Sequence, residues 1–502
     1  MSFLADEKKY FLDTLEEQIA YRPLRRVLSQ ELEAHIQDRM DAYEEQGLPS
    51  KEAEARAVRD MGDPVMVGTE LNKVHQLQRA PAFMVLTLAL LCSGFMAAAG
   101  MRYSPEAYAN GFLYYIPGVL ILFGIAWQGY PLMIRYARRL LAPAGILLVA
   151  EQLLSVRGFS PFWRIGYFRY FALLLFGPFL ILLAYRLRRF GSKTILLIFG
   201  ICGICVLLPG FFGDRHDIPA CAVLVVSVAV TLLMMIHRDI FSAEGWTRRR
   251  LYGIALAGLV LVGSLFGCTE DRREMLQCFI RPDANIRSTW DDTYNSALIR
   301  RLLSETPLHR GIDLTPQELM DYGTGAWYFA GRDPGQIGVY AIYRTEEEEE
   351  AFRARISELR EAGKNPRYIH FDESDVTLWN ILPQHYHNNY RIAVCILLFG
   401  WLAGAGYLAV IGGFYLLMFG CIRRIQGRLA YSLSCCCGLC LLLEGVLYVL
   451  GNFGYQYAAF TNLPLIAEGR LSIAVNMALL GFIFSAYRYD RVGMETSSRL
   501  SF

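Results

Sequence analysis

Acidic side chains gather in a polar segment between two hydrophobic regions of the sequence, and they are the residues best suited to acid–base chemistry. An acidic stretch of this segment begins at Phe279 and carries Asp283 and Asp291. A carboxylate at a membrane–water boundary can serve as a general base toward a lipid-linked substrate. The simpler interpretation is an acidic loop that faces solvent, and the residues by themselves favour it.

Two further carboxylates, Glu151 and Glu444, lie inside long apolar stretches. Placing a charge at the centre of a bilayer costs roughly 3 kcal/mol or more, so such residues are candidates for function. Each can line a route for a substrate or for protons. Each can equally be protonated or paired with a neighbouring helix, and both interpretations stay open.

The twelve cysteines raise the question of a metal or redox site. Cys202 and Cys205 have thioredoxin-like spacing, but they lie in an apolar stretch without a βαβ context. Another apolar stretch contains Cys435, Cys436, Cys437 and Cys440. We expect these six to be small packing residues. Cys268 and Cys278 fall outside the apolar stretches and are candidates for a disulfide. The eight histidines have no paired spacing, so we expect neither a metal site nor a cofactor.

The composition indicates a membrane protein. Of 502 residues, 54% are hydrophobic and 19% are charged, and the mean hydropathy is +0.28. These values exclude a disordered chain, a collagen-like fibre and a small disulfide-rich module. The net charge of +2 gives no basic field for nucleic acid.

Apolar stretches of a length that can cross a bilayer recur along the chain after Pro81. We predict ten spans, near 82–100, 111–134, 141–155, 167–187, 194–210, 218–237, 250–267, 391–420, 429–451 and 471–487. The third is short and is interrupted by Glu151. The expected fold is therefore an all-α polytopic membrane protein, with spans one to seven in 80–267 and spans eight to ten in 391–502.

The distribution of Lys and Arg predicts the orientation. With ten spans and both termini in the cytoplasm, the short internal loops hold fourteen Lys and Arg and the short external loops hold six. This agrees with the excess of positive charge in cytoplasmic loops. We therefore expect a multi-pass protein of the cell membrane, in contact with its lipids, whose polar segment 268–390 faces outward.

The outer segment has a pattern of its own. Alternating apolar residues at 338–343 and 368–371 are typical of strands. Thr345 and Glu348 form the capping box of a helix over 346–360. The sequence thus predicts a small β-α-β insert in the outer segment.

Residues 1–79 are soluble in composition and read as three or four amphipathic helices. Gly47 and Gly62 are expected to end helices, Ser50 to cap one, and Asp63 with Pro64 to begin another. No signal-peptide pattern precedes these helices, so we expect a cytoplasmic bundle.

Three segments together resemble the SEDS family (FtsW, RodA, SpoVE), whose members polymerise lipid II into glycan strands beside a transpeptidase partner. The first segment is Phe279-Ile-Arg-Pro with the acidic stretch after it. The second contains Leu382-Pro383 and Asn389-Tyr-Arg-Ile-Ala. The third runs from Leu463-Pro464 to Ser472 and resembles the terminal signature of the family. The resemblance implies lipid II as substrate and a class B penicillin-binding protein as partner.

The sequence departs from the family at the positions that matter most for catalysis. Asn285 stands where the family has its catalytic Asp, and Asn389 stands where the family has an Asp after the second Leu-Pro. An amide cannot accept a proton as a carboxylate does. Asp283 or Asp291 is then the candidate base. Arg470 replaces a Gly of the terminal motif, and with Asn389, Glu151 and Glu444 it completes the candidates for a substrate path.

Residues 10–78 resemble a second family, the permease prefix (HAAS-type) domain found ahead of membrane proteins in Gram-positive bacteria. Glu31-Leu-Glu-Ala-His35 and Met61-Gly62-Asp63-Pro64-Val65 carry this likeness. It implies a regulatory or assembly role for the leader.

Three functions follow from the sequence. The first is a SEDS-like protein of cell-wall growth or division, either a divergent lipid II glycosyltransferase or a paralogue that keeps the fold without the chemistry. The second is a transporter or flippase for a lipid-linked substrate. The third is a membrane sensor whose outer segment binds a ligand.

Overall fold

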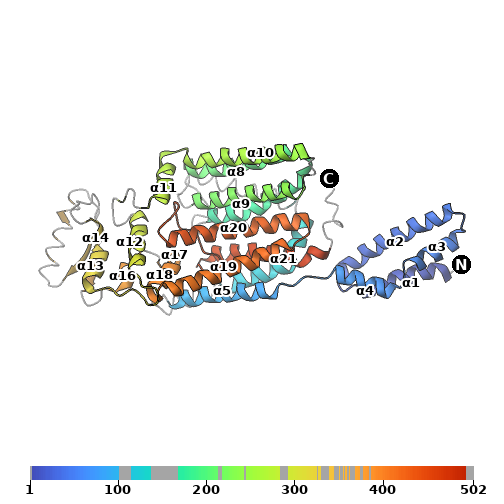
Figure 1. Ribbon diagram of the computed structural model, residues 1–502, viewed down its shortest axis with the longest axis horizontal. Helices are drawn as coiled ribbons and strands as arrows, with labels where there is room; N and C mark the ends of the chain where they lie inside the picture. Colours follow the sequence, from blue (N-terminus) through green and yellow to red (C-terminus); the bar gives the residue numbers. More distant parts are fainter. Residues whose placement is uncertain are drawn as a thin grey trace.

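The computed structural model describes a chain that is mostly helical. The described residues are 3–100, 115–136, 168–212, 217–241, 245–282, 292–324, 326–329, 339–343, 368–372, 377–383, 386–467 and 469–492, with a few isolated positions between them. Figure 1 shows the leader at one end, a bundle of long helices in the middle and the shorter helices of the polar segment at the other end.

The leader forms four helices: α1 (Phe3–Gln18), α2 (Arg22–Glu45), α3 (Ser50–Asp60) and α4 (Pro64–Val74). The predicted end signals at Gly47 and Gly62 are confirmed, since both have the positive φ that glycine tolerates best. Asp63 caps α4 as predicted, because its side chain accepts a hydrogen bond from the Val65 N–H. Ser50 is the first helical residue rather than the cap, a position that Pro49 occupies.

The bundle contains six helices that are long and apolar enough to cross a membrane. They are Tyr115–Tyr136, Asp217–His237, Thr247–Gly267, Trp401–Arg423, Arg428–Asn452 and Leu471–Val492. Three shorter apolar stretches of helix lie at Pro81–Met96, Tyr170–Arg186 and Ser192–Leu207. The third predicted span, 141–155, lies outside the described residues, so the count of ten stays a prediction.

The labelled helices of the bundle begin and end close to the predicted spans. They are α5 (Pro81–Gly100), α7 (Phe168–Arg186), α8 (Ser192–Phe212), α9 (Asp217–His237), α10 (Gly245–Ser264), α18 (Arg391–Phe399), α19 (Trp401–Arg423), α20 (Arg428–Asn452) and α21 (Arg470–Tyr489). Three short 3-10 helices, η2 (Arg188–Phe190), η3 (Leu265–Gly267) and η5 (Asp490–Val492), extend helix ends.

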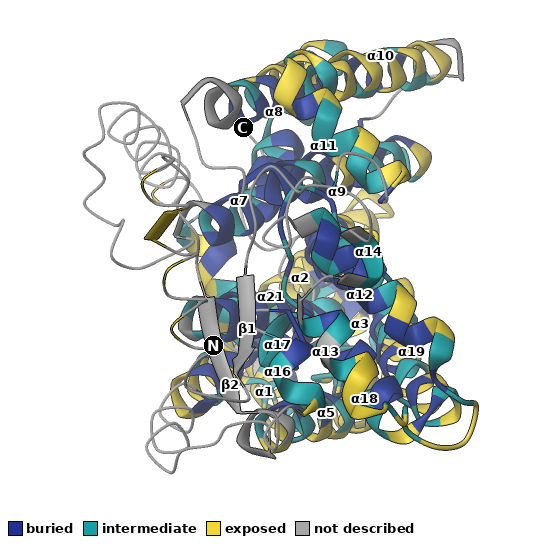
Figure 2. Cartoon of the chain, turned by 90° about the vertical axis from the view of Figure 1, so that its left-hand side faces the viewer, coloured by how far each residue is buried: buried dark blue, intermediate teal, exposed yellow. Residues whose placement is uncertain are grey.

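Burial separates the helices into central and peripheral ones. In the apolar windows of α9 and α10, 72% and 22% of the residues are buried, respectively. Figure 2 shows this contrast as dark blue on α9 and yellow along α10 and α19. Large apolar side chains are exposed on the peripheral helices, including Val260 on α10 and Leu416 on α19. A membrane protein presents such side chains to lipid, whose tails are as apolar as the side chains themselves.

The predicted span 391–420 is wrong as a single helix, because the chain breaks at Gly400 into α18 and α19. Gly400 has φ +88° and ψ 171°, a conformation essentially restricted to glycine. A Cβ at this position would lie 2.7 Å from the backbone nitrogen of Arg310. The segment after α12 crosses the chain at this break. The N–H groups of Trp401 and Leu402 donate to the carbonyls of Pro307 and Leu308 in that segment.

The polar segment is built from short helices and one pair of strands. The helices are α11 (Glu270–Ile280), α12 (Asp292–Glu305), α13 (Pro316–Thr324), α14 (Ala326–Phe329), α16 (Leu378–Ile381) and α17 (Tyr386–Asn389). Strands β1 (Val339–Tyr343) and β2 (Tyr368–Asp372) pair in parallel, with Val339 opposite Tyr368. Most of the predicted helix 346–360 between them lies outside the described residues.

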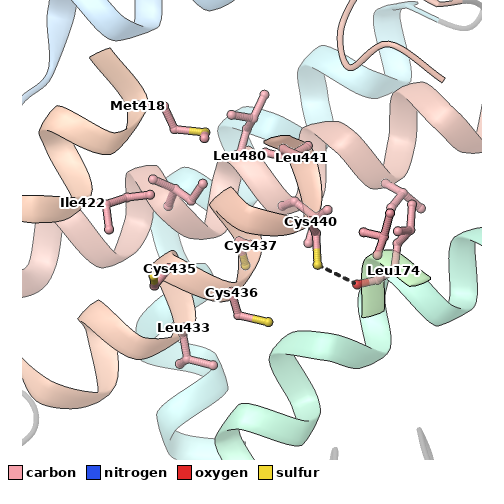
Figure 3. Packing of buried hydrophobic residues seen from close by; sticks show 14 of the residues in the cluster. Leu174, Met418, Ile422, Leu433, Cys435, Cys436, Cys437, Cys440, Leu441 and Leu480 are labelled. Carbon is pink, nitrogen blue, oxygen red and sulfur yellow. Dashed lines mark hydrogen bonds between the residues drawn. The ribbon is translucent and has the colours of Figure 1, made fainter. Parts of the chain in front are cut away.

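The cysteines of α20 are packing residues, as expected. Figure 3 shows them among the aliphatic side chains of neighbouring helices. Cys435, Cys436, Cys437 and Cys440 are each exposed by 1% or less. Among the described residues, no cluster of His, Cys, Asp or Glu could hold a metal ion.

Candidate functional site: a buried polar network at the start of α18

Arg391 is a fully buried cation that joins three separate parts of the chain. It is the first residue of α18, and its side chain is 1% exposed. Its Nε donates to the carbonyl of His387 at 2.7 Å. Its Nη1 donates to the carbonyl of Gly94 in α5, at 2.9 Å, and to that of Ile466. Hydrogen bonds from a charged donor are stronger than neutral ones, so this side chain clamps the three segments together.

Gly94 allows the close approach that the clamp requires. A Cβ at this position would lie 2.8 Å from both the Ile466 Cα and the Leu465 carbonyl oxygen. Backbone atoms cannot move aside as a flexible side chain would, so α5 needs a glycine here. Small residues serve this purpose generally where membrane helices meet another backbone closely.

Two side chains of α20 bind the free backbone groups at the start of α18. Asn452 accepts hydrogen bonds from the N–H groups of Ile392 and Ala393, both at 3.0 Å. Its amide nitrogen donates to the carbonyl of Asn389 at 2.9 Å. Tyr448 donates its hydroxyl to the carbonyl of Asn388 at 2.7 Å. Because the first N–H groups of a helix have no partner within it, this capping from a second helix fixes where α18 begins.

Glu444 lies one turn below Tyr448 on α20 and is completely buried. Its Oε1 accepts a hydrogen bond from the Tyr170 hydroxyl of α7 at 3.1 Å. Its carbonyl accepts one from the Thr461 hydroxyl at 3.0 Å. The second carboxyl oxygen has no hydrogen-bond partner among the described residues. This group links α7, α20 and the loop after α20 at one point.

The loop between α20 and α21 carries the third of the sequence motifs. Residues 463–467 form a buried turn in which Ala467 N–H donates to the Leu463 carbonyl at 2.9 Å. The Arg391 clamp reaches this turn at Ile466. The second and third motifs, more than seventy residues apart in the sequence, are therefore in direct contact.

The first motif is attached to the same loop. The ring of Phe279, near the end of α11, packs edge-on against Tyr457 with centroids 5.5 Å apart. Burial raises the pKa of Tyr457 to about 12. On the other side of the acidic stretch, α12 approaches Gly454 so closely that a Cβ there would lie 2.7 Å from the Ser296 carbonyl oxygen. Both ends of the acidic stretch are thus fixed to the loop after α20.

Of the predicted site residues, four lie outside the described residues: Asp283, Asn285, Asp291 and Glu151. Asn389 ends α17, and its carbonyl belongs to the capping network of Asn452. Arg470 begins α21, and its side chain is also outside the description. Glu444 lies on α20, and Asn389 at the end of α17 is bonded to α20 through Asn452.

The candidate disulfide between Cys268 and Cys278 is not formed. Cys268 precedes the cap of α11, and Cys278 lies near the end of that helix. Eight residues of helix span about 12 Å at 1.5 Å per residue. A disulfide requires Cα atoms within about 7 Å, so one straight helix holds these thiols too far apart.

The sequence places Arg391 in the second motif without indicating its role, and it indicates none for Asn452, Tyr448 or Tyr170. The signal was present for Arg391, because a charged residue inside a predicted span is a candidate for function. The rule that selects Glu151 and Glu444 extends to an Arg at the very start of a span. For Asn452, nothing in the local sequence indicates that it caps another helix.

The structure as a whole defines a class, a polytopic helical membrane protein with a folded segment at one end of its bundle. No protein-family model matches the sequence, and no curated protein matches it in a sequence search. Among solved structures, the chain is similar to one from a study of the structural coordination of polymerization and crosslinking by a peptidoglycan synthase complex. The identity is 14%, the match covers 82% of this chain and 98% of that one, and the TM-score is 0.51. This likeness shows the fold.

Proposed function

We propose that this protein is a SEDS-like membrane protein of peptidoglycan synthesis. The observation that carries the proposal is the shared fold with a chain of a peptidoglycan synthase complex over nearly the whole length of that chain. The three sequence motifs that resemble the SEDS family support it from an independent direction. In the structure they meet at the loop between α20 and α21, as parts of one site would.

The substrate in this proposal is a lipid-linked precursor such as lipid II. A glycosyl transfer from a lipid pyrophosphate needs a base that takes the proton of the attacking hydroxyl. Asp283 and Asp291 are the candidates, because Asn285 cannot accept that proton. The contact of Phe279 with Tyr457 and the close approach of α12 to Gly454 hold the two flanks of this stretch in place. Accurate placement of a base by rigid surroundings is what such chemistry requires.

Polymerisation of lipid II by the purified full-length protein tests the proposal. The variants are Asp283→Asn, Asp291→Asn and Asn285→Asp, with Asp271→Asn as a matched control on the exposed face of α11. Product from the wild type that is lost in Asp283→Asn or Asp291→Asn identifies the base. Product from Asn285→Asp alone identifies a paralogue that keeps the fold without the chemistry. Lipid II binding by the same purified proteins is measured in parallel, and its absence from the wild type and every variant contradicts the proposal.

The partner in this proposal is a class B penicillin-binding protein. A glycan polymerase and a crosslinking enzyme act on the same strands, and the solved neighbour comes from a complex that coordinates both steps. Co-purification of the full chain with such a transpeptidase, from cells that produce both, is the direct test. Failure of the pair to associate would remove the partner from the proposal.

The orientation in this proposal puts the polar segment outside the cell and the leader, a permease-prefix-like domain, in the cytoplasm. Cys268 is exposed in the structure and is suited to labelling. An impermeant maleimide should modify it in intact cells, and the signal should vanish in Cys268→Ser. Labelling that requires lysis would reverse the orientation.

A transporter is the second candidate function, and Glu444 is the observation that favours it. A completely buried carboxyl group in an apolar helix is a feature of proton routes through membranes. Proton-dependent flux of a lipid-linked substrate in vesicles, lost in Glu444→Gln, would establish this function. Normal flux in that variant would exclude Glu444 from it.

A further inference from the structure

A cavity of about 660 Å³ lies where the leader meets the bundle. Its walls come from the end of α1, the connection after α4 and the last residues of α21 with η5. Figure 1 shows this junction at the end of the bundle opposite α12 to α14. The cavity is therefore distinct from the network at the start of α18.

The wall of the cavity is positively charged. Arg79, Arg488 and Arg491 line it together with His75, and no Asp or Glu is among the lining residues. No ion pair of these three arginines occurs among the described residues. Asp490 lies between two of the arginines in sequence, and its carboxylate accepts a hydrogen bond from the side-chain amide of the cavity-lining Gln78 at 3.5 Å. It accepts hydrogen bonds from the N–H groups of Gln426 and Gly427 at 2.7 to 3.1 Å.

Backbone contacts hold the two walls together without using the guanidinium groups. The N–H of Gln78 donates to the carbonyl of Arg488 at 3.0 Å. Nδ1 of His75 is 2.9 Å from the carbonyl oxygen of Arg491. The ring of Tyr21 packs against Tyr489 at 5.9 Å between centroids. These contacts, and not ion pairs of the guanidinium groups, hold the arginines around the cavity.

The cavity lies beside the start of α5, one of the apolar helices of the bundle. Arg488 is placed over the indole ring of Trp127, 4.6 Å from its centroid. Trp127 is 60% exposed on the apolar helix Tyr115–Tyr136. Arg79 stands two residues before α5 enters the bundle. A basic residue just before an apolar helix enters a bilayer lies at the level of the lipid headgroups.

We infer that this cavity binds a phosphate group, and that its source is the headgroup of an anionic phospholipid. Guanidinium groups bind phosphate oxygens through paired N–H donors, and three of them around one cavity match that chemistry. The bound lipid would join the leader to the bundle, because Arg79 belongs to one wall and Arg491 to the other. This inference does not depend on the proposed function.

Native mass spectrometry of the detergent-solubilised full chain tests this inference. The probes are dioleoyl-phosphatidylglycerol, dioleoyl-phosphatidylcholine and inorganic phosphate. We expect phosphatidylglycerol to bind in preference to phosphatidylcholine. Arg491→Gln should weaken its binding about fivefold, the factor that corresponds to roughly 1 kcal/mol per basic residue near an anionic lipid surface. Arg79→Gln combined with Arg491→Gln should weaken it about 25-fold.

Two further variants separate charge from folding. Arg491→Lys keeps the charge and should bind within about threefold of the wild type, whereas Arg59→Gln, on an exposed position of α3, should bind unchanged. Retention of phosphatidylglycerol in excess inorganic phosphate identifies the lipid as the source, and its displacement identifies a soluble phosphate at the same site. Equal binding of both lipids, or equal loss in Arg59→Gln and Arg491→Gln, overturns the inference.

Discussion

Removing the Arg391 clamp should destabilise the bundle strongly. Arg391→Met keeps a side chain of similar length but removes every donor. It leaves the carbonyls of His387, Gly94 and Ile466 without the bonds that they accept in the wild type. A buried acceptor without a partner costs about 1–3 kcal/mol. The substitution also removes the buried charge and the desolvation cost of that charge. We therefore take about 1 kcal/mol, the lower end of this range, for each carbonyl.

The expected loss in the free energy of unfolding is therefore about 3 kcal/mol. Arg391→Lys should lose about 1–2 kcal/mol, since one ammonium group cannot reach carbonyls on three segments in the way a guanidinium fork does. Arg301→Met is the control. Arg301 forms an exposed pair with Glu305 on α12, so its loss should cost less than about 1 kcal/mol.

Unfolding in mixed detergent micelles measures these differences, and thiol labelling adds a local readout. Cys395 lies on α18 and is partly buried. If α18 opens without its clamp, labelling of Cys395 should accelerate about 100-fold in Arg391→Met, as about 3 kcal/mol implies. The result would refute a stabilising role of Arg391 if the unfolding free energies of Arg391→Met and Arg301→Met agreed within about 0.5 kcal/mol.

Three further outcomes are expected. Gly400→Ala should destabilise the bundle by about 3 kcal/mol or more, because of its backbone conformation and the contact with Arg310. Gly406→Ala, with no atom within 4 Å of the added Cβ, should be neutral or stabilising by up to about 1 kcal/mol in the same unfolding assay. Glu444→Gln should keep the bond from Tyr170 and unfold within about 1 kcal/mol of the wild type, whereas Glu444→Leu should lose about 2 kcal/mol. Hydrogen bonds from the Thr315 N–H and hydroxyl lower the pKa of Glu318. The stabilisation of α13 by this group is present above the ordinary pKa of a Glu and is lost as the pH falls through the lowered folded value. Hydrogen exchange at the start of α13 should therefore rise on acidification, and not in Glu318→Gln.

Features that depend on local sequence were predictable. Gly47 and Gly62 end helices because the left-handed cap conformation is a property of the residue itself. Asp63 caps α4 because its side chain reaches an N–H two residues away. The bounds of the apolar helices follow from hydropathy. A helix that lies in lipid or in a buried interior requires apolar side chains along its whole length.

Features that depend on distant contacts were not predictable. The break at Gly400 exists because residues 307–312 cross the chain there, and the apolar pattern runs through 391–420 without a signal. Asn452 and Ile466 meet the start of α18 from sixty or more residues away. The separation of Cys268 and Cys278 depends on α11, a helix that the sequence analysis does not predict.

The proposal that this protein handles a cell-wall precursor is tested most directly by its preference for lipid II over undecaprenyl pyrophosphate. The two share the polyprenyl chain and the pyrophosphate, so a difference in binding reports recognition of the sugar and peptide. The measurement uses purified protein with Arg79→Gln and Arg491→Gln, which removes the proposed anionic site from the comparison. We predict that lipid II is retained preferentially. Equal retention of the two lipids would contradict the account.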